Sequence, residues 1–153
     1  MRFELFENLP EQEWLLEALP KIEWRAGTVL HEALVSGDFH PRFGYTSRLY
    51  FLLDDHKIVG FGTILEQDFH PVPSWRRWIA FIYVYPEYRG WRLSEKIVTF
   101  LEDEIRKLGE TTVHILTQHQ GLYEKFGYTF VREEDDGYHD HSYIYTKDLA
   151  RYR

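Results

Sequence analysis

The sequence predicts a mixed α/β sheet, mostly antiparallel and of six to seven strands, with helices on both faces. Three observations predict it. Short runs of β-branched and aromatic residues recur along the chain, two of them flank a polar turn at residues 54–57, and a long amphipathic stretch at 93–108 separates two others. The first pair forms an antiparallel hairpin, and a strand, helix and strand in succession form a right-handed parallel crossover.

The first part of the chain is predicted to hold one strand and two helices. Polar and apolar residues alternate over 2–6, which predicts a strand. Apolar residues at helical spacing predict a helix over 11–19, and Pro20 ends it. A second, weaker helix is predicted over 28–35. Residues 37–44 contain a proline and a glycine at each end, a composition typical of a loop.

The predicted hairpin consists of strands at 47–53 and 58–65. Gly60 and Gly62 occupy alternate positions of its second strand, and therefore lie on the same face. A face without side chains lets a helix or a ligand approach closely. The alternative explanation for the two glycines is a bulge or bend in the strand.

The parallel crossover is predicted from a strand at 78–85, a helix at 93–108 and a strand at 111–116. The helix carries a broad apolar stripe at period 3.6, and Gly109 is a suitable residue to end it. Ligands of such sheets bind beyond the carboxyl ends of the strands, so the turn after Val84 is the expected position of a site.

The last part of the chain is predicted to close the sheet with a second hairpin. One or two helical turns are expected over 121–126, where Gly127 stops them. A strand at 128–131, an acidic turn at 133–137 and a last strand at 142–146 follow.

Length and composition restrict the class of protein. The chain has 153 residues and no internal repeat or linker, which predicts a single domain over 1–153. Lys and Arg total 18 and Asp and Glu total 25, so the formal net charge is −7, which argues against nucleic acid as a partner. The negative charge is compatible with attracting a cationic amine, or it only keeps the protein soluble.

Residue types that are absent exclude further classes. The sequence has no cysteine, which excludes disulfides, thiolate metal sites and a cysteine nucleophile. The N-terminus lacks an apolar signal core, and no stretch approaches ~18 uninterrupted apolar residues. A cytoplasmic protein without a membrane partner is therefore expected, and a homodimer is left open.

One stretch, from Phe81 to Val98, organises the expected site. It reads as a strand, a proline-marked exit, a short basic turn with a glycine, and the start of the long helix. This order aims several backbone N–H groups at one point, and the positive end of the helix dipole adds to them. The arrangement suits a phosphate or pyrophosphate.

Two motifs resemble those of the GNAT superfamily of acetyl-CoA-dependent N-acyltransferases. Val84 to Ser94 reads V-Y-P-E-Y-R-G-W-R-L-S and is similar to the acetyl-CoA motif V-x-P-x-x-R-G-x-G-x-G/A, which opens a long helix. Leu122 to Tyr128 reads L-Y-E-K-F-G-Y and is similar to the second signature, L-Y-x-x-x-G-F/Y. A strand lies between the motifs, as in the family, and the resemblance covers residues 47–147.

The resemblance implies acetyl-CoA as a co-substrate, without a metal. It implies that the central strand splays from its neighbour and that the pantetheine arm pairs with backbone groups near Ile82 and Val84, where a backbone N–H polarises the thioester carbonyl. The expected cofactor-binding residues are Ile82, Val84, Arg89, Gly90, Trp91, Arg92, Leu93 and Ser94.

The sequence departs from the acetyl-CoA motif at two positions. Arg92 stands where the family has glycine, and Ser94 where it has glycine or alanine. Arg92 can still present its N–H if its φ is negative and its side chain leaves the loop, and it can add charge-assisted bonds to a phosphate. Ser94 can cap the helix or bond a phosphate oxygen. The alternative for Arg89 and Arg92 is a solvated basic turn.

Tyr123 matches the position of the general acid in the family, which protonates the departing sulfur. A phenol with a pKa of ~10 is suited to donate a proton at neutral pH, whereas the alternative for this residue is ring packing on the sheet. The general base remains open because the strand start at 75–78 has no carboxylate where the family often has one. The candidates are Glu66, Asp68, His70, His114 and His119.

Two further groups of residues have weaker functional interpretations. His139 and His141 share a strand face beside Asp140, but two histidines alone make a weak metal site. Five aromatic residues either line an acceptor pocket for an amine with an apolar body or belong to the core. They are Trp75, Trp78, Tyr83, Tyr85 and Trp91.

The expected function is transfer of an acetyl group from acetyl-CoA to a primary amine of a small molecule or peptide, by direct attack in a ternary complex. Two alternatives remain. The chain could be an acyl-CoA-binding module of the same fold without turnover, a reading that Arg92 and the missing base motivate. It could also be an acyltransferase that uses another donor or acceptor.

Overall fold

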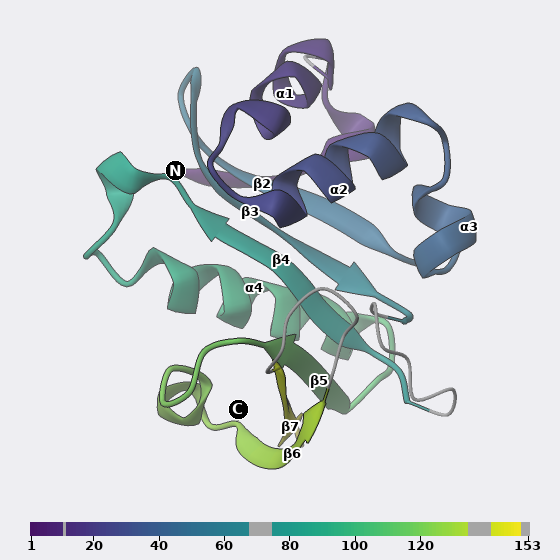
Figure 1. The fold of residues 1–153 in the computed structure, drawn as a ribbon, viewed down its shortest axis with the longest axis vertical. Helices are drawn as coiled ribbons and strands as arrows, with labels where there is room; N and C mark the ends of the chain where they lie inside the picture. Colours follow the sequence, from purple (N-terminus) through teal and green to yellow (C-terminus); the bar gives the residue numbers. More distant parts are fainter. Residues whose placement is uncertain (11, 68–74, 135–141, 151–153) are drawn as a thin grey trace.

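The computed structural model describes residues 1–10, 12–67, 75–134 and 142–150. Its seven strands form one sheet in the order β1-β2-β3-β4-β5-β7-β6 (Figure 1). The strands are β1 Arg2–Leu5, β2 Arg48–Asp54, β3 Lys57–Leu65, β4 Trp78–Val84, β5 Thr112–Thr117, β6 Thr129–Glu134 and β7 Ser142–Asp148. The α-helices are α1 Gln12–Ala18, α2 Arg25–Val35, α3 Phe39–Phe43 and α4 Leu93–Lys107.

The topology confirms the predicted mixed, mostly antiparallel sheet. Every neighbouring pair of strands is antiparallel except β4 and β5, which α4 connects as a parallel crossover. The predicted hairpin of β2 and β3 is also confirmed, with Asp54 opposite Lys57 and Asp55 at a φ of +56° in the turn.

The helices cover both faces of the sheet, as predicted (Figure 1). Helices α1, α2 and α3 lie on one face, over a core that includes Phe51, Phe61 and Trp78. Helix α4 lies on the other face and buries its apolar stripe, with Ile97 and Leu101 at its centre. None of the helices in the described residues has the length and hydropathy needed to span a bilayer.

The two glycines of β3 let α4 pack closely against the sheet. A Cβ added to Gly62 would lie 2.8 to 2.9 Å from side-chain atoms of Ile82, Ile97 and Leu101. A Cβ added to Gly60 would collide with the main-chain carbonyl oxygen of Tyr83. The bare face therefore accommodates a helix, as one explanation expected. The alternative explanation, a bulge, also holds, because the pairing of β3 with β4 shifts at Gly62.

The prediction of a loop over 37–44 was wrong, because residues 39–43 form the short helix α3. Phe39 and Phe43 are four residues apart, and one helical turn buries both. Pro41 lies within the first turn, where no helical partner for its missing N–H exists. Gly44, at a φ of +113°, ends the helix.

Other element boundaries also differ from those predicted. Helix α2 begins at Arg25 rather than Thr28, and its first turn includes Gly27, where a Cβ would collide with Ile22 and approach the carbonyl of Leu19. Strand β6 continues to Glu134, so the first part of the predicted acidic turn is strand. Its charged residues are tolerated because β6 is an edge strand that faces solvent.

Candidate active site

The parallel strands β4 and β5 are paired over only a short distance. Trp78 lies opposite His114 and Ile79 opposite Ile115, and the described residues of the two strands make no pair beyond these. A cavity of about 740 Å³ opens beyond the last pair. Residues 79–84 of β4 contribute a continuous part of its wall.

The cavity passes through the sheet, because residues from both cores line it. On the face of α2, the lining includes Trp24, Val29, Phe81, Tyr83 and Leu116. On the face of α4, it includes Ile82, Val84, Leu93, Leu122 and Tyr123. Two molecules can therefore approach one another in this cavity from opposite faces of the sheet.

A β-bulge lies within the part of β4 that lines the cavity. Phe61 pairs with Tyr83 and Thr63 with Ala80, so two residues of β4 lie opposite one residue of β3. Phe81 has a φ of +52° within this bulge. The Thr63 hydroxyl donates a 2.7 Å hydrogen bond to the Ala80 carbonyl next to it. Bulges re-aim side chains and backbone beside active sites.

The first turn of α4 lies at the edge of the cavity on the α4 face. Gly90, Arg92, Leu93 and Ser94 all line the cavity there. The first amides of a helix have no partner within it, and the helix dipole makes this end positive. The mouth of α4 is thus suited to an anion such as a phosphate.

Arg92 and Ser94 are arranged differently from the expectation. Arg92 is the N-cap of α4 with a φ of +57°, so the negative φ that was the condition for presenting its N–H is not met. It therefore takes the left-handed conformation of the glycine that it replaces, at a cost of about 1–2 kcal/mol. Ser94 is the second residue of α4 and does not cap it.

The remaining residues of the predicted cofactor site divide into two groups. Arg89 lines the cavity, donates from Nε to the Val84 carbonyl at 2.9 Å, and places its guanidinium 5.4 Å from the centre of the Tyr83 ring. Ile82 and Val84 line the cavity as well. The structure does not bring the Trp91 side chain to the cavity, because it is 70% exposed and is not part of the lining.

Tyr123 lines the cavity from the 3₁₀ turn η4, Tyr123–Phe126. Gly127, at a φ of +91°, stops this turn as the sequence predicted. The Tyr123 side chain is buried, and burial raises the pKa of its phenol to about 12. The hydroxyl is therefore protonated throughout the neutral range and can act as a proton donor.

The structure separates the candidates for the general base. His119 lines the cavity. Glu66 does not, and hydrogen bonds from Thr46 lower the pKa of its carboxyl. Burial lowers the pKa of His114 to about 4, and this side chain is not part of the lining. Asp68 and His70 lie outside the described residues.

The aromatic residues of the cavity wall include Trp24 and Tyr83, whose rings stack with centres 5.3 Å apart. Tyr83 was among the predicted aromatic residues, but Trp24 was missed. Trp24 is the N-cap of α2, and the late predicted start of that helix placed it in an unassigned stretch. The lining also includes three polar residues that no sequence pattern indicated, namely Glu23, Arg25 and Ser142.

The other predicted aromatic residues belong elsewhere. Trp75 stacks on His114 with ring centres 4.5 Å apart, and Trp78 is fully buried in the core beside them. Tyr85 packs edge-on against Tyr83 and is not part of the lining. These three rings therefore have structural roles.

No group of three metal-ligating side chains occurs within the part of the chain that the structure describes. The sequence cluster of His139, Asp140 and His141 lies outside that part.

A family model described as the acetyltransferase (GNAT) family matches residues 11–128. A search of curated protein sequences gave no significant match. Many solved structures share the fold. An aminoglycoside 6'-N-acetyltransferase from Enterococcus faecium has a TM-score of 0.70 and 18% identity, with 97% of each chain covered. An acetyltransferase from Streptococcus agalactiae has a TM-score of 0.67 and 21% identity, covering 97% of this chain and 98% of that one.

A third solved structure, of a GNAT family acetyltransferase from Elizabethkingia anophelis, contains bound acetyl-CoA. Its TM-score is 0.65 and its identity 14%, with 97% of each chain covered. At these identities the likeness concerns the fold.

Proposed function

Because the chain belongs to the GNAT family of acetyltransferases, we propose that it transfers an acetyl group from acetyl-CoA to a primary amine of a small molecule or peptide. The observation that carries the proposal is the cavity that crosses the sheet between β4 and β5. Its lining residues come from both faces of the sheet, so the donor and the acceptor could bind together from opposite sides, as direct attack in a ternary complex requires.

The residues at the mouth of α4 fit the diphosphate of coenzyme A. Gly90 has open space where a Cβ would be, so the backbone can be approached closely. The amides that follow it, the helix dipole and the guanidinium of Arg92 supply positive charge at one end of the cavity. The edge of β4 from Ile82 to Val84 would hold the pantetheine arm by main-chain hydrogen bonds.

Bound acetyl-CoA supplies an acyl carbon that an amine can attack and a sulfur that can leave. The amine nitrogen forms the new C–N bond as the C–S bond breaks. We assign the proton that the sulfur gains to the Tyr123 hydroxyl, and its raised pKa keeps that proton in place until transfer. The proton lost by the amine goes to water or to His119, the base candidate that lines the cavity.

The α2 face of the cavity favours a cationic acceptor with an apolar body. The stacked rings of Trp24 and Tyr83 provide a flat apolar wall that suits the body of such an acceptor. Glu23 lies in the same lining and would attract its charge, while Arg25 beside it offsets part of that attraction. The net charge of −7 would also attract a cation. Since one solved relative acts on aminoglycosides, these amines belong in a panel of acceptors together with aromatic amines and peptides.

A second candidate is binding of an acyl-CoA without turnover, or use of another acyl donor or acceptor. The strained Arg92 at the glycine position is the observation that favours it. The left-handed backbone keeps the loop in shape, but the bulky side chain stands beside the proposed diphosphate site.

The test is thiol release from acetyl-CoA with the acceptor panel, for the wild type and for Tyr123→Phe. We expect the variant to lower kcat roughly 100-fold or more, as loss of a general acid does, while KM for acetyl-CoA changes little. Because the pKa of Tyr123 is about 12, its protonation should not limit kcat up to pH ~10.

The matched control is Tyr45→Phe, which removes the same hydroxyl from a tyrosine that is 79% exposed and should leave kcat unchanged. Equal activity of Tyr123→Phe and wild type would remove the acid assignment. Binding of acetyl-CoA with no release of thiol for any acceptor would favour the second candidate.

A further inference from the structure

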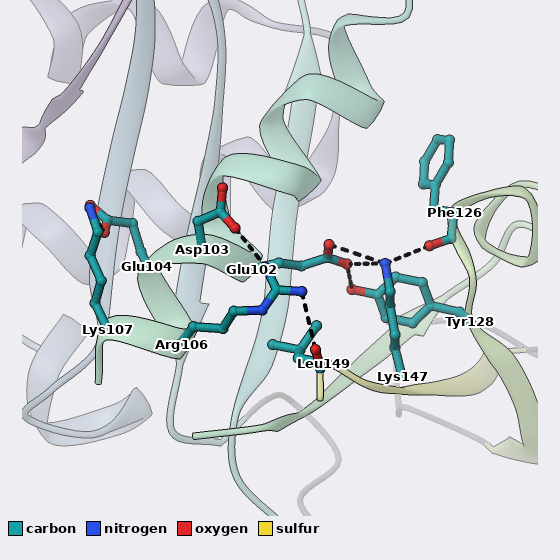
Figure 2. A network of polar contacts seen from close by, with 9 residues as sticks. All are labelled: Glu102, Asp103, Glu104, Arg106, Lys107, Phe126, Tyr128, Lys147 and Leu149. Atoms are coloured by element: carbon teal, nitrogen blue, oxygen red, sulfur yellow. Dashed lines mark hydrogen bonds and ion pairs between the residues drawn. The ribbon is translucent and has the colours of Figure 1, made fainter. Parts of the chain in front are cut away.

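A buried cluster of charged and polar groups adjoins Phe126, the last residue of the turn η4 (Figure 2). Glu102 of α4 and Lys147 of β7 form an ion pair, with Nζ 3.1 and 3.2 Å from the two carboxylate oxygens. The Tyr128 hydroxyl donates to the same carboxylate at 2.7 Å. All three side chains are at most 8% exposed.

This cluster is tied directly to the turn η4. Lys147 Nζ donates a 2.8 Å hydrogen bond to the carbonyl of Phe126, the last residue of the turn (Figure 2). The backbone N–H of Tyr128 donates to the carbonyl of Tyr123 at 3.0 Å. The rings of Tyr123 and Tyr128 are also in edge contact, with centres 5.9 Å apart. Thus the cluster bonds the last residue of the turn through Lys147 and contacts its first residue through the Tyr128 ring.

Burial of an ion pair is a weak way to stabilise a fold, since desolvation offsets most of the attraction. A buried, charged donor does fix the direction of the carbonyl that it binds. Burial and the neighbouring Glu102 carboxylate raise the pKa of Tyr128, so its hydroxyl remains a donor to that carboxylate. The geometry therefore points to positioning of the turn, rather than stabilisation of the fold, as the main role of the cluster.

We propose that Glu102, Lys147 and Tyr128 are positioning residues, which hold turn η4 so that the Tyr123 hydroxyl faces the cavity. This inference rests on the proposed acid role of Tyr123. Glu102 lies on the same helix whose first turn lines the cavity, so one rigid element would fix the diphosphate site and the acid relative to each other.

The experiment replaces both charges together, as Glu102→Gln with Lys147→Met. Removing Lys147 alone would leave a buried carboxylate with less compensation and could unfold the protein. The Gln oxygen still accepts from Tyr128, whereas the bond to the Phe126 carbonyl is lost. The matched control is Lys107→Met, which removes an exposed ion pair with Glu104 (3.0 Å) on the same helix.

We expect the double variant to lower kcat by roughly ten- to a hundredfold, as a small displacement of a reacting group does, and to leave KM for acetyl-CoA within about twofold. When Tyr123 is already replaced by Phe, the double variant should lower kcat by less than about twofold further. The reason is that the double variant and Tyr123→Phe impair the same function, proton donation by Tyr123. Lys107→Met should behave as wild type in either background.

Hydrogen exchange of the free protein gives a second readout that needs no acceptor. The amides of Gly127 and Tyr128 donate to carbonyls of the turn, and they should exchange faster in the double variant while amides of β2 and β3 do not. Unchanged exchange in this segment would overturn the proposal, with or without a known acceptor.

The kinetic outcomes keep the two claims apart. A fully active Tyr123→Phe would defeat the proposed acid, and with it the part of this inference that concerns catalysis. If Tyr123→Phe is impaired but the double variant has wild-type kcat, or if the two effects multiply, the acid role stands and the positioning role is wrong.

Discussion

Burial is the main cause of the pKa shifts of individual side chains in this protein. His114 is 6% exposed, stacks against Trp75 and shares a 2.8 Å hydrogen bond between its Nδ1 and the Thr146 hydroxyl. Burial disfavours its charged form and lowers its pKa from 6.5 to about 4. The side chain is therefore neutral in the folded protein at any physiological pH and serves as a packing residue.

This shift predicts a dependence of stability on pH. Between pH 4 and 6.5 the unfolded chain binds a proton at His114 and the folded chain does not, so the free energy of unfolding falls as the pH falls through this window. From pH 7.5 to 5.0 the wild type should lose roughly 1–2 kcal/mol more than His114→Gln, which does not titrate. Urea unfolding of both proteins at the two pH values measures the difference, and equal losses would show that His114 titrates normally.

At the level of residues, the resemblance of a whole motif was a better guide than residue type. The resemblance to the acetyl-CoA motif implied that residues 89–94 lie beside a ligand, and five of these six line the cavity. It did not predict the positive φ of Arg92, because arginine rarely adopts the left-handed backbone conformation that glycine adopts freely. Trp24 was missed because nothing local connects a residue before α2 with the edge of β4.

At the level of elements, two glycines of β3 control how closely the sheet meets its neighbours. A Cβ at Gly62 would meet only side-chain atoms, namely the ends of Ile82 and Leu101 and the Cγ2 methyl of Ile97, whereas a Cβ at Gly60 would meet the main-chain carbonyl of Tyr83 at a shorter distance. Both positions adjoin the bulged part of β4 that forms the wall of the cavity.

The two glycines should therefore respond differently to alanine. We expect Gly62→Ala to lower the free energy of unfolding by roughly 1 kcal/mol and Gly60→Ala by roughly 3 kcal/mol, since overpacking against fixed backbone is the costlier case. Gly60→Ala should also weaken binding of coenzyme A, because it displaces β4 near Val84. Urea unfolding tests the order, and a larger loss for Gly62→Ala would contradict it.

Long periodic elements were predicted well from the sequence, and short ones were not. Helix α4 has an apolar stripe over four turns, and its start at Leu93 was predicted correctly. Helix α3 buries only two phenylalanines and is too short for a periodic signal, so the glycines and the proline of this segment led to the prediction of a loop. The bulge at Phe81 depends on pairing between two strands, which no single segment encodes.

At the level of the whole molecule, the cavity results from the order of the strands. A parallel crossover through α4 brings β4 and β5 together at one end only, and the cavity opens beyond that end. The sequence predicted the crossover, and the cavity lies beyond the paired part of its two strands. The passage of the cavity to the face of α2 required the positions of Trp24 and Val29, which only the three-dimensional fold provides.

The central claim is that the mouth of α4 binds the diphosphate of coenzyme A, and calorimetric titration with coenzyme A tests it most directly. The comparison is between Gly90→Asp and Gly109→Asp, two glycines with positive φ and open space, near opposite ends of α4. Aspartate tolerates this conformation. We predict one site per chain in the wild type and in Gly109→Asp, and loss of binding in Gly90→Asp by charge repulsion. No heat with the wild type, or equal affinity of both variants, would contradict the account.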